Sequence, residues 1–280
     1  MNVFTSKTEL TKFLEQERIK DKNIGFVPTM GALHQGHLSL IQESRKRTNL
    51  TVCSIYVNPT QFNVKSDLEN YPRNTEKDIE LLVSENCDVC FLPNTNDVYP
   101  NGVSKLLEIN LSGLDKRMEG ERRSGHFDGV VTVVNNLFEI INPDIAFFGE
   151  KDFQQLAVIR KMTQVLNMNV EIVGCPIIRE PDGLAMSSRN ERLTRHERLA
   201  ATFIYNTLLA TKNLNGSIQE KKDFVIKQFE NHALFKLDYF DITSEKNLTA
   251  CIEEHSKLTR AFIAAFIGKV RLIDNIALNN

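Results

Sequence analysis

Two histidines separated by two residues close the most informative segment of this sequence, the decapeptide PTMGALHQGH at residues 28–37. Gly31 and Gly36 allow a ligand to approach the backbone closely, and Gly36 opens a predicted helix whose N-terminal amides favour an anion. The imidazoles of His34 and His37 flank this helix start and are suited to donate hydrogen bonds to phosphate oxygens. A histidine cation there would complement the charge that develops on a leaving pyrophosphate. The alternative is two ordinary turn histidines, but their position at a strand-to-helix turn favours a function.

A second segment with similar chemistry is FGEKDFQQ at residues 148–155. Gly149 ends a predicted buried strand, and Lys151 supplies a point charge for a phosphate. Asp152 is able to accept hydrogen bonds from ribose hydroxyls or to help hold Mg²⁺. Gln155 lies one turn into the following helix, so its amide is able to point back at a substrate. The acidic residues could instead cap this helix, and the two roles are compatible.

A third segment, REPDGLAMSSRN at residues 179–190, begins with a Pro-Asp-Gly turn. It then presents the hydroxyls of Ser187 and Ser188 and the guanidinium of Arg189. These groups suit a loop that closes on phosphates. By itself the segment could be a polar loop between domains, but its combination with the two histidines favours the phosphate clamp.

Uncharged side chains follow another predicted strand. The segment NPTQF places the carboxamides of Asn58 and Gln61 at a strand end, where they suit the hydroxyl and carboxylate groups of a small hydroxy acid. The segment GHFDG precedes a predicted helix on which Val133 and Val134 could form the wall for the apolar part of that acid. For His126 in this segment, a structural and a functional role both remain open.

The elements that must position these residues alternate between strands and helices. We predict strands at 24–27, 51–57, 88–92, 145–148 and 170–173, and helices from residue 36 and at 75–83, 129–141 and 153–166. Nearly all-apolar strands in this alternation predict an α/β fold, a Rossmann-like parallel sheet with helices on both faces. Ligands of such sheets bind beyond the carboxyl ends of the strands. Pro28–His37, Asn58–Phe62 and Gly149–Asp152 are therefore expected to converge on one edge of the sheet.

The pattern changes after about residue 176. A capping box at Thr194 and Glu197 predicts a long helix to about residue 213, as a similar box at Ser6 and Glu9 does for the first helix. A further helix near 217–232 and strands at 237–243, 261–267 and 270–273 predict a smaller α+β domain. We thus expect a Rossmann-like domain at 1–176 that binds both the nucleotide and the hydroxy acid, and a smaller α+β lid domain at 177–280, with the MSSR segment at its start.

Composition limits the classes of partner. The net charge is −2 and no stripe of Lys and Arg stands out, which argues against a nucleic-acid partner. No apolar run reaches the roughly 18–20 residues of a membrane span, and the N-terminus does not resemble a signal peptide. The five cysteines are scattered, so we expect a soluble protein of the reducing cytoplasm. Cys87 and Cys90 lack a second pair and run into a strand, which favours buried thiols over a metal or redox site.

Taken together and in order, these segments resemble the pantothenate synthetase (pantoate–β-alanine ligase) family. The matching stretches are PTMGALHQGH (28–37), VNPTQF (57–62), YPR (71–73), EG…GHFDGVVTVV (119–134), FGEKDFQQ (148–155), REPDGLAMSSRN (179–190) and RLIDN (271–275). More distantly, HxGH together with MSSR looks like the paired signature of nucleotidyltransferases and class I aminoacyl-tRNA synthetases.

The resemblance implies a two-step ligase reaction that belongs to the biosynthesis of pantothenate and coenzyme A. ATP and (R)-pantoate give pantoyl adenylate and pyrophosphate, and the amine of β-alanine then releases pantothenate and AMP. The resemblance also implies Mg²⁺, bound mainly through the ATP phosphates, and a homodimer built through the first domain. Lys77 stands where some members have an acidic residue near the metal, so this segment is not assigned a direct ligand.

The resemblance carries residue roles over to matching positions of this sequence. It implies pantoate contacts from Gln61, Gln155 and Met30, to which we add Val133 and Val134, and a β-alanine contact from Gln61. The implied ATP site consists of Met30, Gly31, Ala32, Leu33, His34, Gln35, Gly36, His37, Gly149, Glu150, Lys151, Asp152, Ile178 through its backbone, Met186, Ser187, Ser188 and Arg189. Catalysis is assigned to His34, His37, Lys151, Ser187, Ser188 and Arg189. The family describes His37 as a proton donor, whereas we expect it mainly to stabilise charge.

Two other classes of function share part of these features. A nucleotidyltransferase that acts on a phosphorylated acceptor would use the histidines and the serine segment, but would not need Gln61 and Gln155 at a hydroxy-acid pocket. A regulatory nucleotide-binding module would need the phosphate cradle without Lys151, Arg189 and the acid pocket together. An aminoacyl-tRNA synthetase is disfavoured because no basic RNA-binding surface is evident.

Overall fold

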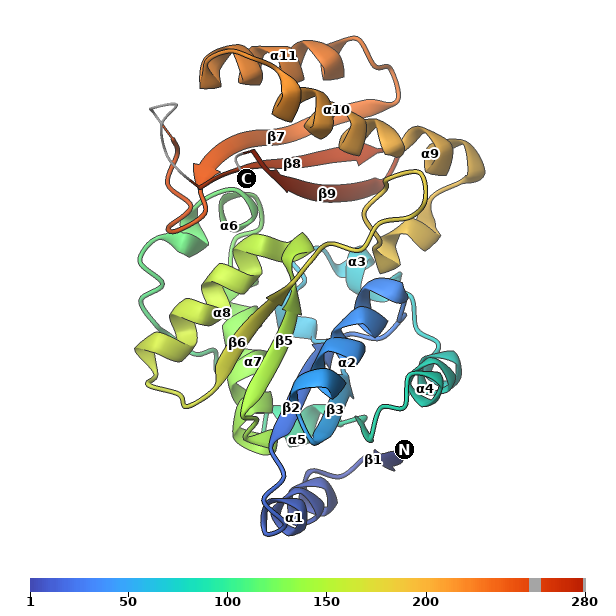
Figure 1. Ribbon diagram of the computed structural model, residues 1–280, viewed down its shortest axis with the longest axis vertical. Helices are drawn as coiled ribbons and strands as arrows, with labels where there is room; N and C mark the ends of the chain where they lie inside the picture. The colour runs from blue at the N-terminus through green and yellow to red at the C-terminus, as the bar shows by residue number, and fades with distance from the viewer. Residues whose placement is uncertain (252–257, 279–280) are drawn as a thin grey trace. The chain divides into compact units, whose positions relative to one another are not determined.

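The computed structural model describes residues 1–251 and 258–278. The chain forms two compact units (Figure 1). The first consists of Met1–Glu150 and Gln154–Pro176, and the second of Lys151–Phe153 and Ile177–Asn280. Lys151–Phe153 thus group with the later part of the chain, although the sequence placed them in the first domain. Within the described residues, no helix has the length and apolar character needed to cross a bilayer.

The first unit contains a six-stranded parallel sheet with the strand order β1-β4-β3-β2-β5-β6. The strands are β1 (Asn2–Phe4), β2 (Ile24–Thr29), β3 (Leu50–Ile55), β4 (Val89–Phe91), β5 (Ile145–Gly149) and β6 (Glu171–Cys175). From β2 the chain proceeds outward to β3 and β4, and then returns to the other side of β2 for β5 and β6. The point where the direction reverses lies between β2 and β5, and in such sheets a crevice for ligands opens there beyond the carboxyl ends of the strands.

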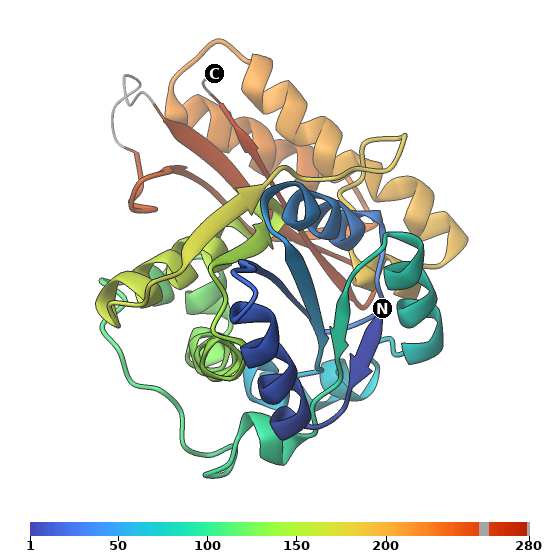
Figure 2. The same cartoon turned by 60° about the horizontal axis from the view of Figure 1, so that its bottom comes forward.

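Helices cover both faces of this sheet (Figures 1 and 2). On one face α2 packs against β2, β3 and β5 and contacts α4, and on the other α1 contacts α7. The helices of the unit are α1 (Lys7–Arg18), α2 (Gln35–Arg47), α3 (Lys65–Glu69), α4 (Thr75–Ser84), α5 (Thr95–Val98), α6 (Glu119–Arg122), α7 (His126–Ile141) and α8 (Phe153–Val165), with short 3₁₀ helices η1 (Pro59–Gln61) and η2 (Leu114–Lys116). A third 3₁₀ helix, η3 (Glu150–Asp152), has its first residue in this unit and its other two in the second. The predicted Rossmann-like sheet with helices on both faces is confirmed.

Burial explains why the central strands read as continuous apolar runs. Phe26 and Val27 of β2 and Val52 and Cys53 of β3 are fully buried, since both faces of these strands are covered. The sequence predicted a strand at 24–27 that is broken by Pro28. In the structure, strand β2 includes Pro28 and continues to Thr29. Pro28 pairs with Ser54 of β3, while the pairing with β5 is confined to Gly25 and Phe26. Proline lacks a backbone donor, and it is tolerated here because the strand has a partner on one side only.

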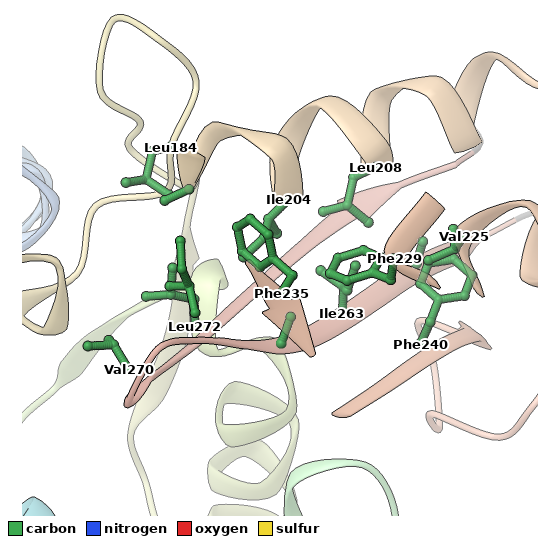
Figure 3. Close-up of a cluster of buried hydrophobic side chains, with 14 of the residues drawn as sticks. Leu184, Ile204, Leu208, Val225, Phe229, Phe235, Phe240, Ile263, Val270 and Leu272 are labelled. Carbon is green, nitrogen blue, oxygen red and sulfur yellow. The ribbon is translucent and has the colours of Figure 1, made fainter. Parts of the chain in front are cut away.

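The second unit contains an antiparallel sheet with the order β7-β8-β9, covered on one face by α10 and α11 (Figure 3). Its strands are β7 (Phe235–Ser244), β8 (Thr259–Ile267) and β9 (Val270–Ala277), and its helices are η4 (Ser188–Arg192), α9 (Arg195–Ala200), α10 (Thr202–Asn213) and α11 (Ile218–Glu230). The core between them includes Ile204 and Leu208 of α10, Val225 and Phe229 of α11, and Ile263 of β8. This arrangement confirms the predicted smaller α+β part of the fold.

The two predicted capping boxes have different outcomes. Thr194 and Glu197 form the reciprocal pair of hydrogen bonds and begin α9. The long helix predicted from there is divided at Ala201 into α9 and α10. The box predicted at Ser6 is wrong, because Ser6 occupies the N-cap of α1 but its side chain makes no capping hydrogen bond.

Candidate active site

The histidine segment forms a capped turn between β2 and α2. His34 is the N-cap of α2, and its Nδ1 accepts a hydrogen bond of 3.1 Å from the backbone amide of Gly36. In return, Nδ1 of His37 accepts from the backbone amide of His34 at 3.3 Å. The two imidazole rings lie 4.1 Å apart between centroids. The helix starts at Gln35, one residue earlier than expected, and both rings are fixed at its N-terminus.

These hydrogen bonds select a protonation state. An imidazole nitrogen that accepts from a backbone amide carries no proton, so the neutral rings of His34 and His37 hold their proton on Nε2. In an imidazolium both nitrogens are donors, and Nδ1–H would then face another N–H group. The capped geometry therefore favours neutral Nε2–H donors over the histidine cation that we expected from the sequence.

A carboxylate from another helix holds the turn that precedes the histidines. Asp78 of α4 is buried, and its two oxygens accept from the amides of Ala32 at 2.9 Å and Leu33 at 2.7 Å. Gly31 and Ala32 both have positive φ, at 79° and 50°. A Cβ at Gly31 would lie 2.9 Å from Oδ2 of Asp78, so the carboxylate also requires glycine there. Asp78 was not among the predicted site residues. The signal for it in the sequence is its position four residues before the fully buried Leu82, on the apolar face of α4.

Gln61 follows β3 and contacts the start of the histidine turn. It is buried, and its Nε2 donates to Sδ of Met30 at 3.1 Å. Its Oε1 accepts from Nδ2 of Asn58 at 3.1 Å. Two of the residues predicted to bind pantoate, Gln61 and Met30, are therefore in direct contact. Because β3, β2 and β5 are adjacent and parallel, the segments after these strands start from one sheet edge, as predicted.

Asn58 has a supporting place rather than the substrate-facing one we expected. It is 1% exposed, and its amide donates to Gln61 Oε1 and to the carbonyl of Gly129. Its Oδ1 accepts from the hydroxyl of Tyr99 at 2.6 Å and from Thr60. Burial raises the pKa of Tyr99 to about 12, so this hydroxyl stays a donor at neutral pH. The amide of Asn58 is thus used within the fold, and it orients Gln61.

Two further side chains position the Gln61 backbone. Nδ1 of the buried His126 lies 2.8 Å from the carbonyl oxygen of Gln61, so Nδ1 carries the proton. Nε2 of this ring then accepts from Nη1 of Arg123 at 3.1 Å. A Cβ at Gly129 would lie 2.5 Å from the carbonyl oxygen of Thr60, so glycine is required where α7 meets η1. Of the two roles left open for His126, these contacts support the structural one.

The two consecutive glutamines at the start of α8 have different surroundings. Gln154 is buried, and it donates to the carbonyls of Leu114 and Arg117 and accepts from the amide of Glu119. Gln155 is half-buried in the first turn of α8. Val133 and Val134 of α7 are buried.

The GEKD segment is divided between the units. Gly149 ends β5 and Glu150 follows in the first unit, while Lys151 and Asp152 belong to the second. The side chain of Lys151 is 17% exposed, and its Nζ lies 3.9 Å from Oδ1 of the more exposed Asp152. The backbone carbonyl of Lys151 accepts from Nδ2 of Asn275 at 2.9 Å.

The MSSR segment is a hydrogen-bonded hairpin followed by a short helix. The amide of Met186 donates to the carbonyl of Ile178 at 3.0 Å, and Arg179 pairs with Ala185. Ser187 is the N-cap of η4, and its Oγ accepts from the amide of Arg189. Ser188 is buried, whereas Ser187 and Arg189 are half-buried. The backbone of Ile178 is the part that we expect to contact the nucleotide, and its carbonyl accepts a hydrogen bond within the hairpin.

No cluster of metal-ligating residues is found in the part of the chain that the structure describes. Cys87 and Cys90 lie in an apolar cluster with Cys53, and burial raises the pKa of each of these two thiols to about 12. Lys77 is exposed on α4, and the carboxylate of its neighbour Asp78 is bound to backbone amides.

Comparisons with known proteins agree with this geometry. A family model described as pantoate-beta-alanine ligase matches residues 2–277. The pantothenate synthetase of Flavobacterium psychrophilum is 50% identical over 282 residues, which cover 99% of this chain and 100% of that protein. A pantothenate synthetase structure from Thermus thermophilus superposes with a TM-score of 0.93 at 37% identity, with 100% of both chains covered. A pantoate-beta-alanine ligase from Francisella tularensis, solved in complex with beta-gamma ATP and beta-alanine, has a TM-score of 0.83 at 35% identity, with 99% of this chain and 98% of that chain covered. The chain therefore belongs to the pantoate–β-alanine ligase family.

Proposed function

We propose that this protein is an AMP-forming carbon–nitrogen ligase that condenses (R)-pantoate with β-alanine. A carboxylate oxygen of pantoate attacks the α-phosphorus of ATP, and the bond to the β-phosphate breaks to release pyrophosphate. The amine of β-alanine then attacks the carbonyl carbon of pantoyl adenylate. Its excess proton is lost, AMP leaves, and pantothenate is the product.

The observation that carries this proposal is the contact between Gln61 and Met30. It places an uncharged carboxamide, suited to hydroxyl and carboxylate groups, at the beginning of the turn that leads to the phosphate-binding helix start. A ligase that adenylates an acid needs the acid beside the α-phosphate. We therefore assign Gln61, Gln155, Met30, Val133 and Val134 to pantoate, and Gln61 also to β-alanine.

The nucleotide is assigned to the histidine turn and to segments of the second unit. The N-terminus of α2, with the Nε2–H groups of His34 and His37, supplies donors for the phosphates. Lys151 adds a fixed positive charge, and the segment Met186–Arg189 adds two hydroxyls and a guanidinium. The remaining residues of the nucleotide site are Gly31, Ala32, Leu33, Gln35, Gly36, Gly149, Glu150, Asp152 and the backbone of Ile178.

His37 acts mainly by stabilising charge. As a neutral Nε2–H donor it forms a hydrogen bond that strengthens when negative charge grows on the departing pyrophosphate. Breaking the α,β-phosphate bond requires stabilisation of this charge and does not require a proton. A His37→Gln variant that keeps most of its turnover would rule out an essential role.

Mg²⁺ would be bound mainly through the ATP phosphates. The residues present fit this arrangement, because Asp152 offers a carboxylate with 47% of its side chain exposed, whereas both oxygens of Asp78 are bound to backbone amides. When bound, the ion would neutralise phosphate charge. We further propose that the enzyme is a homodimer built through its first domain (1–176), that residues 177–280 form the lid domain, and that the enzyme acts in the cytoplasm.

Isotope exchange tests the adenylation step. Labelled pyrophosphate should enter ATP when pantoate is present and β-alanine is absent, because the first step is then reversible and the second cannot proceed. Exchange without any organic acid, or only with a phosphorylated acceptor, would show that the protein is a nucleotidyltransferase of another kind. Omission of Mg²⁺ from the same assay tests the proposed ion.

A further inference from the structure

The segment RLIDN in β9 has no role in the proposed reaction, yet two of its residues contact the phosphate-binding segments of the second unit. Nδ2 of Asn275 donates to the backbone carbonyl of Lys151 at 2.9 Å. The carboxylate of Asp274 binds the guanidinium of Arg179 through two hydrogen bonds of 2.6 and 2.9 Å. Both β9 residues are buried, at 1% and 4% exposure. Because these side chains are buried, their contacts with Lys151 and Arg179 are part of the interior of the second unit.

The two residues use opposite faces of the sheet, because neighbouring side chains of a strand alternate. Asn275 pairs across the sheet with Phe262, whose ring lies 5.9 Å from the ring of Phe153. Arg260, two residues from Phe262 on the same face, stacks on Phe153 at 4.1 Å and donates to Oδ1 of Asn275 at 2.6 Å. This face therefore holds Lys151–Phe153 by a hydrogen bond, a ring contact and a cation–π contact.

The other face holds the start of the MSSR segment. Asp274 pairs with Ile263, which points into the core beneath α10 (Figure 3). Arg179, bound to Asp274, also stacks over Tyr205 of α10 at 3.9 Å and donates to the carbonyl of Gly183. Leu184, in the same hairpin, is part of this core. Strand β9 therefore holds both the hairpin that precedes Ser187 and Ser188, through Asp274, and the backbone of Lys151, through Asn275.

We propose that strand β9 is a positioning element that holds both phosphate-binding segments of the second unit as one rigid body. Asn275 fixes the backbone at Lys151, and Asp274 fixes Arg179 at the start of the segment that carries Ser187–Arg189. Charges held at constant spacing stabilise a transition state without having to reorganise during the reaction. The inference rests on the proposed function, because that function assigns these two segments to the phosphates of ATP.

The variant Asn275→Asp tests this role. It has nearly the same shape and keeps the acceptor for Arg260, but it places a carboxylate oxygen against the Lys151 carbonyl. The kcat of pantoate-dependent exchange is expected to fall on the order of 10- to 100-fold, the effect of a small misplacement at a reacting centre. The KM for pantoate should stay within about twofold, because Gln61 and Gln155 lie in the other unit. If Asn275→Asp does not fold, Asn275→Ser, which is too short to reach Lys151, replaces it.

Asp238→Asn is the matched control. It breaks the ion pair of 2.8 Å between Asp238 of β7 and Arg271, which belongs to the same RLIDN segment of β9; these two side chains are 17% and 19% exposed. This variant should lose stability and keep its kcat for exchange. Equal losses of kcat in Asn275→Asp and in the control would overturn the inference, because general weakening of the sheet would then explain both.

A double-mutant cycle with Lys151→Ala shows whether Asn275 acts through Lys151. If it does, Asn275→Asp should lower exchange far less in the Lys151→Ala background than in the wild type. Effects that multiply would overturn the inference. If the Lys151→Ala protein shows no measurable exchange, ATP affinity from calorimetry supplies the same cycle. Failure of the proposed function is distinct from these results, because the wild type itself would then show no pantoate-dependent exchange.

Asp274→Asn tests the second contact. It removes the charge that binds Arg179 while keeping the shape of the side chain. Exchange should fall, and the double variant Asp274→Asn, Arg179→Gln should be little worse than either single variant, because both changes break one pair. Wild-type exchange in Asp274→Asn would overturn the role of this residue.

Discussion

The carboxylate of Asp78 lies 2.7 Å from the backbone nitrogen of Leu33, although the two residues are 45 positions apart in the chain. The second carboxylate oxygen binds the amide of Ala32. Through these bonds α4 holds the turn that precedes the two histidines. A carboxylate suits this place because each of its oxygens satisfies one buried N–H group.

Asp78→Asn should destabilise the protein and slow pyrophosphate exchange. Its amide group replaces one acceptor with a donor, so that one buried backbone N–H loses its partner, at a cost of about 1–3 kcal/mol. Urea unfolding measures the loss of stability. The exchange assay measures the loss of activity that is expected if the turn before His34 and His37 is displaced. Lys77→Ala, an exposed change on the same helix, should alter neither. Unfolding of Asp78→Asn at the wild-type urea concentration would contradict this prediction.

Substitutions of His34 should separate its capping role from its role toward phosphate. Asparagine offers an oxygen near the position of Nδ1 and is a favoured N-cap, so His34→Asn should remain as stable as the wild type. His34→Ala loses the cap and should lose about 0.5–2 kcal/mol. Both variants lack the Nε2–H donor, so both should lose exchange activity. If His34→Asn kept wild-type exchange while His34→Ala lost it, capping would be the whole role of this residue.

The histidine tautomers are expected to differ within the first unit. His34 and His37 should be Nε2–H tautomers, because both Nδ1 atoms accept from backbone amides. His126 should be the Nδ1–H tautomer, since its Nδ1 faces a carbonyl oxygen. Long-range ¹⁵N–¹H NMR spectra of labelled protein near pH 8 distinguish these forms. An Nδ1–H signal from His34 would contradict the capped geometry.

Gln154 and Gln155 form a matched pair for the acid site. Gln155→Ala should raise the KM for pantoate and leave ATP affinity and the melting temperature nearly unchanged. Gln154→Ala loses bonds to Leu114, Arg117 and Glu119, and should cost about 1–3 kcal/mol of stability. Steady-state kinetics measure the KM for pantoate, calorimetry measures the affinity for ATP, and thermal unfolding measures the stability. Loss of ATP binding in Gln155→Ala would contradict its assignment to pantoate.

Cysteine reactivity should follow burial. Burial raises the pKa of Cys87 and Cys90 to about 12 and that of Cys175 to about 11. A raised pKa keeps these thiols protonated at pH 8, and the thiolate is the reactive form. Iodoacetamide should therefore modify the half-buried Cys251 first, as measured by mass spectrometry of peptides. All five cysteines should react in denaturant, and rapid native labelling of Cys90 would contradict the buried cluster.

Local patterns in the sequence predicted most of the fold. Apolar runs and helical periodicity located strands β2 to β6 and the longer helices around them, since both faces of β2 and β3 had to be covered, whereas the short edge strand β1 (Asn2–Phe4) was not predicted. The rule that ligands bind beyond strand ends then placed the segments after β2, β3 and β5 on one edge. The errors were local ones. Pro28 continues its strand because β5 pairs with β2 only at Gly25 and Phe26, so no donor is needed at Pro28 on that side. Ser6 lies at the N-cap of α1, but its hydroxyl makes no hydrogen bond to the helix start.

The sequence by itself thus determined which chemical groups are available: imidazoles at a helix start, a lysine after a strand, and amides for a hydroxy acid. Tertiary structure decided what these groups do, because hydrogen bonds between distant residues assign donors and acceptors. Asn58 looked like a substrate ligand, but Tyr99 and Gly129 occupy its amide. The roles of Asp78 and Asn275 emerged only from the folded chain, since the backbone groups they bind, at Leu33 and Lys151, are distant from them in the sequence.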